Sequence, residues 1–281
     1  MRPVSTPWLL AAILVALLAC PRTSSPASTF DRDYRAYAAV LAAHVEGDRV
    51  DYRALQANRA ALDAVVQGFA EVGEADLAGW PRADQMAFWI NAYNALTLQV
   101  IVDHYPIRSR VFSLAPRNSI RQIDGVWTKI TWPVAGRRVT LDDIEHAILR
   151  PVYGDARIHF AVNCASVSCP PLALEPYRGA SLDAQLDVAA RRYLSSPLGL
   201  IVDGTTLRVS SLFKWYGEDF VEGYAPLGPA RGSSIDRAIL GMVGRYGPEA
   251  ARQLAASGRA RVRFLTYDWS LNDVNPGSPV P

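Results

Sequence analysis

The feature that most constrains the fold is the segment of residues 83–104, which predicts a long helix with apolar side chains on nearly every face. Phe88, Ala95 and Leu98 lie away from its main stripe. A helix of this kind has to be surrounded by protein, so the rest of the chain is expected to pack around it. Pro106 ends the helix. The main stripe consists of Met86, Trp89, Ile90, Tyr93, Leu96, Thr97, Val100 and Ile101.

The other expected elements are mostly helices, and the strands are short and lie late in the chain. This predicts an α+β fold, a helix-rich single domain with a small, mostly antiparallel sheet. No repeat or linker interrupts residues 31–275, and residues 276–281 form a frayed tail rich in Gly and Pro. Expected helices span residues 31–44, 53–68, 141–149, 181–195 and 234–246, and expected extended pieces span 49–52, 136–140, 199–210 (a hairpin) and 261–267.

The N-terminus is typical of a targeting segment. Arg2 is followed by an almost wholly apolar run, residues 8–19, which is too short to span a bilayer. The run ends in Leu-Leu-Ala-Cys20, which resembles a bacterial lipobox, and residues 21–30 predict a disordered tether. We therefore expect residues 1–20 to be a signal peptide with lipobox, and an exported, periplasmic or membrane-anchored lipoprotein held to the membrane by a lipid on Cys20. The alternative is an ordinary secretory signal that is cleaved near Ala27.

The charge balance argues against a nucleic-acid partner. The chain has 29 basic and 27 acidic residues, a formal net charge of +2, and no basic stripe interleaved with aromatic residues. Nothing in the sequence predicts a cofactor.

The segment of residues 157–171 combines a strand-like run with three reactive side chains. Ile158, Phe160 and Val162 alternate as in a strand, and His159, Cys164 and Cys169 lie on or just after this run. Reactive groups at the end of a rigid element are a common arrangement in functional sites. The segment therefore predicts a catalytic site, a disulfide, a metal site or only a tight corner.

Four separated motifs, spread over residues 80–275, together resemble the DUF547 family, a domain of unknown function. The resemblance implies an exported bacterial protein, and in plants and animals the domain is joined to other modules, some of them glutaredoxin-like. It also implies that Cys164 is retained in plant members while Cys169 is often Ser, which favours Cys164 as the functional residue. The motifs are Phe88–Ala95 (FWINAYNA), Leu141–His146 (LDDIEH) with Leu149-Arg150, Ile158–Cys164 (IHFAVNC) with Ser168-Cys-Pro170, and Tyr267–Asn272 (YDWSLN).

The first chemical hypothesis is a nucleophilic Cys164. A thiolate needs a lowered pKa, which a neighbouring imidazole can provide. On a regular strand His159 and Cys164 would face opposite sides, so His146 is an equally good candidate base. Asn91 or Asn94 would orient that base or form an oxyanion hole, as in papain- and transglutaminase-type folds, to which a distant similarity is expected. Alternatively, the two amides hold loop backbone and Cys164 is a small core residue.

Three other kinds of chemistry remain open at this stage. Cys164 and Cys169 can form a disulfide, as a local staple or a redox switch. Glu145 or His146 can serve in acid–base catalysis, but only one of them can face a given cleft because neighbours on a helix point about 100° apart. The His and Cys spacings fit no familiar zinc module, so no metal site is predicted.

The sequence hypothesis for function is thus a cysteine-dependent hydrolase or acyltransferase that acts on a peptide or amide bond. One alternative is a non-catalytic envelope module that binds a partner, and another is a thiol–disulfide redox protein.

Overall fold

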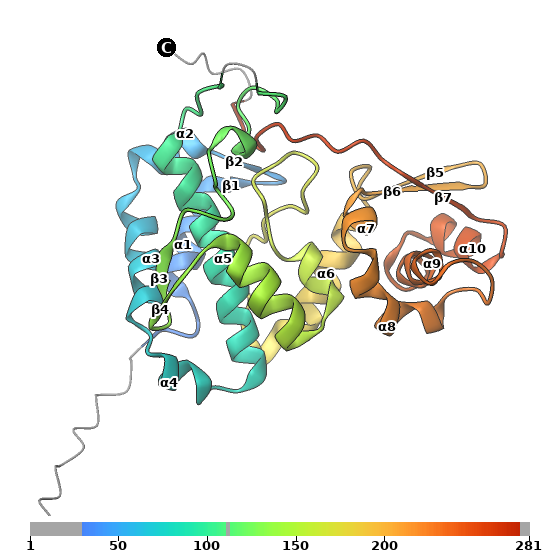
Figure 1. Ribbon diagram of the computed structural model, residues 1–281, viewed down its shortest axis with the longest axis horizontal. Helices are drawn as coiled ribbons and strands as arrows, with labels where there is room; N and C mark the ends of the chain where they lie inside the picture. The colour runs from blue at the N-terminus through green and yellow to red at the C-terminus, as the bar shows by residue number, and fades with distance from the viewer. Residues whose placement is uncertain (1–29, 111–112, 276–281) are drawn as a thin grey trace, which may run out of the picture.

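The computed structural model describes residues 30–110 and 113–275 (Figure 1). The predicted signal peptide, Cys20, nearly all of the predicted tether and the predicted frayed tail lie outside the described residues. The described chain is rich in helices, with three small sheets of two, two and three strands. The expected α+β class is confirmed.

The long helix expected from the sequence is α5, Arg82–His104, and it is the centre of the larger part of the molecule (Figure 1). Every side chain from Met86 to Leu98 is buried, including the polar side chains of Asn91 and Asn94. Four helices precede α5 in the chain: α1 (Arg35–His44), α2 (Tyr52–Ala57), α3 (Ala60–Glu71) and α4 (Glu74–Ala78). The antiparallel pair β1–β2 (Val45–Glu46, Arg49–Val50) also precedes it, and the pair β3–β4 (Trp132–Val134, Arg137–Val139) follows it.

The single helix expected over residues 53–68 is wrong, because the structure divides it into α2 and α3. Asn58 ends α2, and its side-chain amide donates to the Ala54 carbonyl at 3.1 Å. A short polar side chain that bonds backbone in this way competes with helix continuation.

The helix expected over residues 141–149 begins with the predicted cap. The Thr140 hydroxyl accepts from the Asp143 backbone N–H at 3.0 Å, and the Asp143 carboxylate accepts from the Thr140 N–H at 2.8 Å. From Asp143 to Tyr153 the helix, η2, has the wide π form, with Pro151 inside it. Long π-helices are rare, and single π turns are frequent at functional sites.

The strand expected at Ile158–Val162 is wrong. Residues Ala156–Phe160 form a 3₁₀ helix, η3, which begins where the Asp155 carboxylate accepts the Arg157 backbone N–H at 2.9 Å. The alternation of apolar residues has another origin, since Ile158 lies in one hydrophobic cluster and Phe160 in another.

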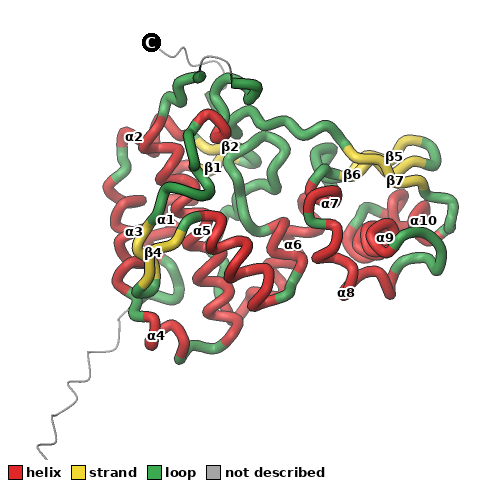
Figure 2. Tube along the Cα trace, viewed as in Figure 1, coloured by secondary structure: helices red, strands yellow, loops and turns green. Residues whose placement is uncertain are grey.

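The elements from α6 to β7 make up the narrower part of the molecule, and the chain after β7 runs back to the larger part, where Asp273 pairs with Val50 (Figures 1 and 2). Strand β6 pairs antiparallel with β5, as expected for the hairpin, and parallel with β7, which is shorter than expected. Helix α10 was not predicted, because its buried residues are alanines that give little periodic signal. These elements are α6 (Leu182–Leu194), β5 (Leu200–Asp203), β6 (Thr206–Val209), α7 (Leu212–Trp215), α8 (Val221–Tyr224), α9 (Ser234–Tyr246), α10 (Glu249–Ala256) and β7 (Arg261–Phe264).

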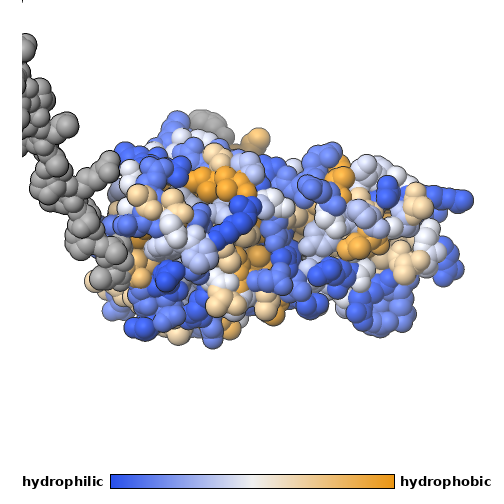
Figure 3. All heavy atoms as spheres, turned by 90° about the horizontal axis from the view of Figure 1, so that it is seen from below, coloured by the Kyte–Doolittle hydropathy of each residue, from blue (hydrophilic) through white to orange (hydrophobic). Residues whose placement is uncertain are grey.

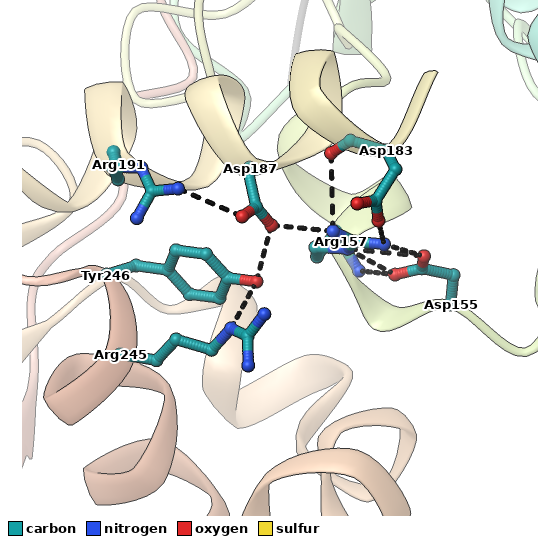
Figure 4. Close-up of polar contacts among 7 residues, drawn as sticks. All are labelled: Asp155, Arg157, Asp183, Asp187, Arg191, Arg245 and Tyr246. Carbon is teal, nitrogen blue, oxygen red and sulfur yellow. Dashed lines mark hydrogen bonds and ion pairs between the residues drawn. The ribbon is translucent and has the colours of Figure 1, made fainter. Parts of the chain in front are cut away.

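Two hydrophobic clusters make up the core. The first surrounds α5 and the second surrounds α9, and α6 contributes to both through Leu186 in the first and Tyr193 in the second. Polar contacts also join the two, because Arg157 of η3 binds Asp187 of α6, which accepts a hydrogen bond from Tyr246 of α9 (Figure 4). The outer face seen in Figure 3 is mostly hydrophilic, with small separate apolar patches.

Candidate functional site

Cys164 and Cys169 lie together in the loop that follows η3, and both are free thiols. Their sulfur atoms are 2.7 Å apart and share a hydrogen bond, and the backbone N–H of Cys164 donates to the Cys169 sulfur at 2.9 Å. Cys169 is buried, whereas Cys164 is half-buried. Of the two residues, Cys164 is thus the less enclosed.

Two asparagines hold this loop in place. Asn94 of α5 donates to the Ala161 carbonyl at 2.9 Å and accepts from the backbone N–H of Asn163 at 2.8 Å. The side chain of Asn163 makes two hydrogen bonds across the loop: it accepts from the backbone N–H of Ala165 and donates to the carbonyl of Pro170. Ala165 has φ of +55°, a left-handed conformation that favours glycine, so the turn that carries the thiols is locally strained.

The C-terminal segment of the described chain covers one side of the loop. Backbone N–H groups of Val167 and Ser168 donate to the carbonyls of Ser270 and Asp268, at 2.8 and 3.1 Å. This pairing brings the Tyr267 hydroxyl to 3.3 Å from the Cys164 sulfur and 3.2 Å from the Ser166 hydroxyl. Residues about 100 positions apart in the sequence therefore form one polar group around a single sulfur.

The surroundings shift the pKa values of the two thiols in opposite directions. The hydrogen bond with Cys169 lowers the pKa of Cys164, in spite of burial, and contacts with Ser166 and Tyr267 add to the effect. Burial raises the pKa of Cys169 well above its usual range, and the neighbouring Cys164 raises it further. Cys164 is consequently the more readily ionised and the more accessible of the two.

His159 contacts a carboxylate instead of either thiol. Its Nε2 lies 2.7 Å from Asp219 Oδ2, and its ring stacks on Tyr216 at 4.1 Å between centroids. Burial alone would raise the pKa of Asp219, but hydrogen bonds from His159 and Arg150 hold that pKa well below its usual range. Asp219 is thus an anion, and His159 Nε2 donates its hydrogen to it.

His146 lies near the same tyrosine. Its Nδ1 is 2.8 Å from the Arg150 guanidinium, and its ring stacks on Tyr216 at 6.2 Å. Arg150 binds Asp219 with two hydrogen bonds of 2.6 and 2.9 Å. Both candidate bases therefore belong to one cluster around Tyr216 and Asp219, and the described contacts of the Cys164 sulfur are with Cys169, Ser166 and Tyr267.

Glu145 is buried and accepts a hydrogen bond from the Tyr93 hydroxyl at 3.1 Å. It lies near enough to the thiols for its negative charge to raise the pKa of Cys164, although less strongly than the hydrogen bonds lower it. Of the predicted acid–base residues, Glu145 is the one whose charge acts on the thiol.

Asn91 makes the same kind of contact as Asn94. Its side chain donates to the Tyr177 carbonyl at 2.7 Å and accepts from the Tyr177 N–H at 2.9 Å. These bonds are the ones expected from the alternative interpretation, in which the amides hold loop backbone. Asn94 still acts on the site, since it fixes the residue next to Cys164.

Several residues of this region were not predicted from the sequence. Tyr93 and Tyr267 belong to two of the motifs but were not expected at the site, and Tyr216 and Asp219 belong to none of the motifs. The motif context of Tyr267 could have indicated it. The other contacts depend on chain segments that meet only in the fold.

In residues 30–110 and 113–275, no group of three or more His, Cys, Asp or Glu side chains is arranged to hold a metal ion. In the same part of the chain, no helix has the length and apolar character needed to cross a membrane.

Comparison with known families identifies the part of the chain that carries this site. Residues 77–194 match the model of the family described as "Protein of unknown function, DUF547". This segment is similar to the DUF547 family. The resemblance expected from the motifs is confirmed over these residues, whereas the fourth motif, Tyr267–Asn272, lies beyond the match. The matched segment includes α5, η2, η3 and both thiols, while Tyr216, Asp219 and Tyr267 lie beyond it. Searches of curated proteins and of solved structures gave no match.

Proposed function

We propose that this protein carries out thiol–disulfide exchange in the cell envelope, with Cys164 as the attacking thiol and Cys169 as the resolving thiol. The observation that carries the proposal is the pair of free thiols whose sulfur atoms lie 2.7 Å apart. Two sulfurs this close need only a small displacement to reach the bonding distance of about 2.05 Å.

The different environments of the two thiols support this division of roles. The attacking thiol of an exchange reaction has to be accessible and ionised, and Cys164 is half-buried with a lowered pKa. The resolving thiol acts only after a mixed disulfide has formed, so Cys169 can be buried and protonated until then.

The reaction balances without any further reagent than a substrate disulfide, R–S–S–R′. The Cys164 thiolate attacks one sulfur, the S–S bond breaks, and R′S⁻ leaves and takes up a proton. Cys169 then gives up its proton and attacks the Cys164 sulfur, so that RS⁻ leaves and a Cys164–Cys169 disulfide forms. The protein is oxidised by two electrons and the substrate is reduced by two.

The test is incubation of the reduced protein with bis(2-hydroxyethyl) disulfide, followed by intact-mass and peptide-map analysis. We expect the protein to lose two hydrogen atoms and to contain a Cys164–Cys169 link. Cys169→Ala should stop at the mixed disulfide on Cys164, and Cys164→Ala should not react at the same rate. Wild-type protein that stays reduced with excess disulfide would rule out the proposal.

A second candidate function, acyl transfer by Cys164, is favoured by the same lowered pKa of a half-buried thiol. Its electrophile is a peptide or amide carbonyl, as the sequence hypothesis proposes. The two functions differ in their need for Cys169, since an acyl-enzyme on Cys164 does not require a resolving thiol. A stable thioester adduct on Cys169→Ala after exposure to an activated peptide ester would favour acyl transfer. Reaction with neither electrophile would favour the non-catalytic binding module.

The cell-envelope location is proposed from the N-terminal sequence alone. We propose export and a lipid on Cys20, which would hold the domain at a membrane in a compartment where disulfides form. Incorporation of labelled fatty acid that is lost in Cys20→Ala is the expected result. Release of unlipidated wild-type protein after cleavage near Ala27 would contradict the lipid anchor.

A further inference from the structure

A group of aromatic side chains, of which Trp215 is exposed and Tyr267 and Trp269 are partly buried, lies next to the attacking thiol. Trp215, Tyr267 and Trp269, which we call the aromatic ledge, contact one another with ring centroids 4.6 to 5.7 Å apart. Tyr267 joins this ledge to the site, because its hydroxyl is 3.3 Å from the Cys164 sulfur. A molecule that binds to the aromatic ledge therefore lies with one end beside the Cys164 sulfur.

The ledge contains apolar surface that the fold leaves in solvent. Trp215 retains 45% of its accessible surface, although it is the last residue of α7, whose Leu212 and Phe213 are buried in the second cluster. An exposed tryptophan contributes little to the core, and aromatic residues of this kind are enriched where proteins bind partners. Trp269 is only partly covered, and Trp127 packs against its far side at 6.2 Å.

The charged residues on this surface favour an acidic ligand. The exposed Arg121 guanidinium lies 5.1 Å from the centre of the Trp269 ring, and the exposed Lys214 precedes Trp215. The carboxylate of Asp268 lies between Tyr267 and Trp269 in sequence, but it accepts the backbone N–H of Ser270 at 2.9 Å. The cation placed directly against the ledge is thus the Arg121 guanidinium, and an arginine on an aromatic ring is well placed to bind a carboxylate.

We propose that the substrate is a disulfide within an extended polypeptide, whose apolar side chain lies on the aromatic ledge and whose neighbouring acidic side chain binds Arg121. This inference rests on the proposed thiol–disulfide exchange and specifies its substrate class. The polypeptide brings one sulfur of its disulfide to Cys164, which attacks it as described above. A small disulfide lacks the groups that the ledge and Arg121 recognise, so it reacts only at the basal rate.

The experiment compares three probe disulfides with reduced protein by stopped-flow detection of thiol release. One probe is bis(2-hydroxyethyl) disulfide, and the other two are identical peptide disulfides in which Phe precedes the half-cystine and either Asp or Lys follows it. We expect the Phe–Asp peptide to react at least tenfold faster than the Phe–Lys peptide. Trp215→Ala should slow the Phe–Asp peptide by about tenfold more than it slows the small disulfide, as the loss of an aromatic contact predicts.

Two further variants separate recognition from general damage. Arg121→Glu should invert the preference between the Asp and Lys peptides. Val188→Ala, on a side chain of α6 that is 62% exposed, should change none of the rates. Equal rates for both peptides, or a Trp215→Ala variant that slows all three probes alike, would overturn this inference while leaving the exchange reaction intact. Failure of the wild-type protein with the small disulfide would instead overturn the proposed function.

Discussion

At the scale of single residues, the reactivity of Cys164 results from neighbours with opposite effects on its pKa. The hydrogen bond with Cys169 is the strongest influence, and it lowers the pKa of Cys164 further than burial raises it. Ser166 and Tyr267 lower the pKa as well, whereas the charge of Glu145 raises it. Each of these contributions can be removed by one substitution, and the sign of the change differs between them.

The first prediction concerns the neighbours that lower the pKa. Cys169→Ala removes the hydrogen bond that lowers the pKa of Cys164 most, while the opposing effect of burial remains, so we expect the pKa of Cys164 to rise. Ser166→Ala and Tyr267→Phe should raise it by successively smaller amounts. The measurement is the rate of carboxamidomethylation of Cys164 as a function of pH, with mass-spectrometric readout. A Cys169→Ala profile that coincides with the wild type or moves to lower pH contradicts the prediction.

The second prediction has the opposite sign. Glu145→Gln keeps the shape and the contact with Tyr93 but removes a negative charge near the thiolate, so the pKa of Cys164 should fall. The same alkylation profile should move to lower pH. Glu175→Gln, on an exposed residue, is the control that should leave the profile in place. An unchanged or higher pKa in Glu145→Gln would show that this carboxylate does not act on the site.

At the scale of elements, local patterns predicted those parts of the fold that have local causes. Helix α5 was predicted from its apolar faces, and the hairpin β5–β6 from Asp203-Gly204, which the structure places at its turn. The strand expected at residues 158–162 could not be corrected from the sequence, since its alternation arises from two separate clusters. For the site, the sequence indicated Cys164 and Cys169. The contact between the Cys164 sulfur and the Tyr267 hydroxyl depends on backbone hydrogen bonds to a segment about 100 residues away, which the sequence does not indicate.

The third prediction uses two asparagines of α5 that lie one turn apart. Asn94→Ala removes the two hydrogen bonds that hold Ala161 and Asn163, so it should destabilise the protein by about 1–3 kcal/mol and alter the pKa of Cys164. Asn91→Ala loses a similar pair of bonds to Tyr177 and should cost about as much stability while leaving the thiol unchanged. Urea denaturation and the alkylation profile measure the two effects. Equal alkylation profiles in both variants would show that Asn94 has no influence on the pKa of Cys164.

At the scale of the whole molecule, one buried arginine connects the two hydrophobic clusters. The Arg157 guanidinium, whose side chain is 12% exposed, binds Asp155, Asp183 and Asp187 at 2.6 to 2.7 Å (Figure 4). Asp187 also accepts the Tyr246 hydroxyl of α9 at 2.6 Å, so the contact crosses from η3 through α6 into the second cluster. The ion pairs of Arg157 join residues 2 to 30 positions apart, and the Tyr246–Asp187 hydrogen bond joins residues 59 positions apart. No local pattern in the sequence indicates which of these groups meet.

The last prediction concerns the stability that the protein loses when Asp155 and Asp187 no longer have the Arg157 guanidinium as a partner. Arg157→Ala should destabilise the protein by about 3–5 kcal/mol at neutral pH, because Asp155 and Asp187 remain largely buried. Arg191→Ala, which removes an exposed partner of the same Asp187, should cost less than about 1 kcal/mol. Burial opposes ionisation of Asp187, but hydrogen bonds from Tyr246 and Arg157 lower its pKa below the usual 3.8.

The stability of Arg157→Ala at different pH values tests how the ion pair between Arg157 and Asp187 stabilises the folded protein. A carboxyl with a lowered pKa in the folded state stabilises the protein above its unfolded pKa and loses that effect as the pH falls through the folded value. The wild type should therefore lose stability below about pH 4. The difference between wild type and Arg157→Ala should shrink there, since a protonated Asp187 no longer needs the guanidinium. Urea denaturation at pH 7 and at about pH 3 measures both differences. A difference that stays constant or grows on acidification would show that the two clusters are held together by packing instead of by this ion pair.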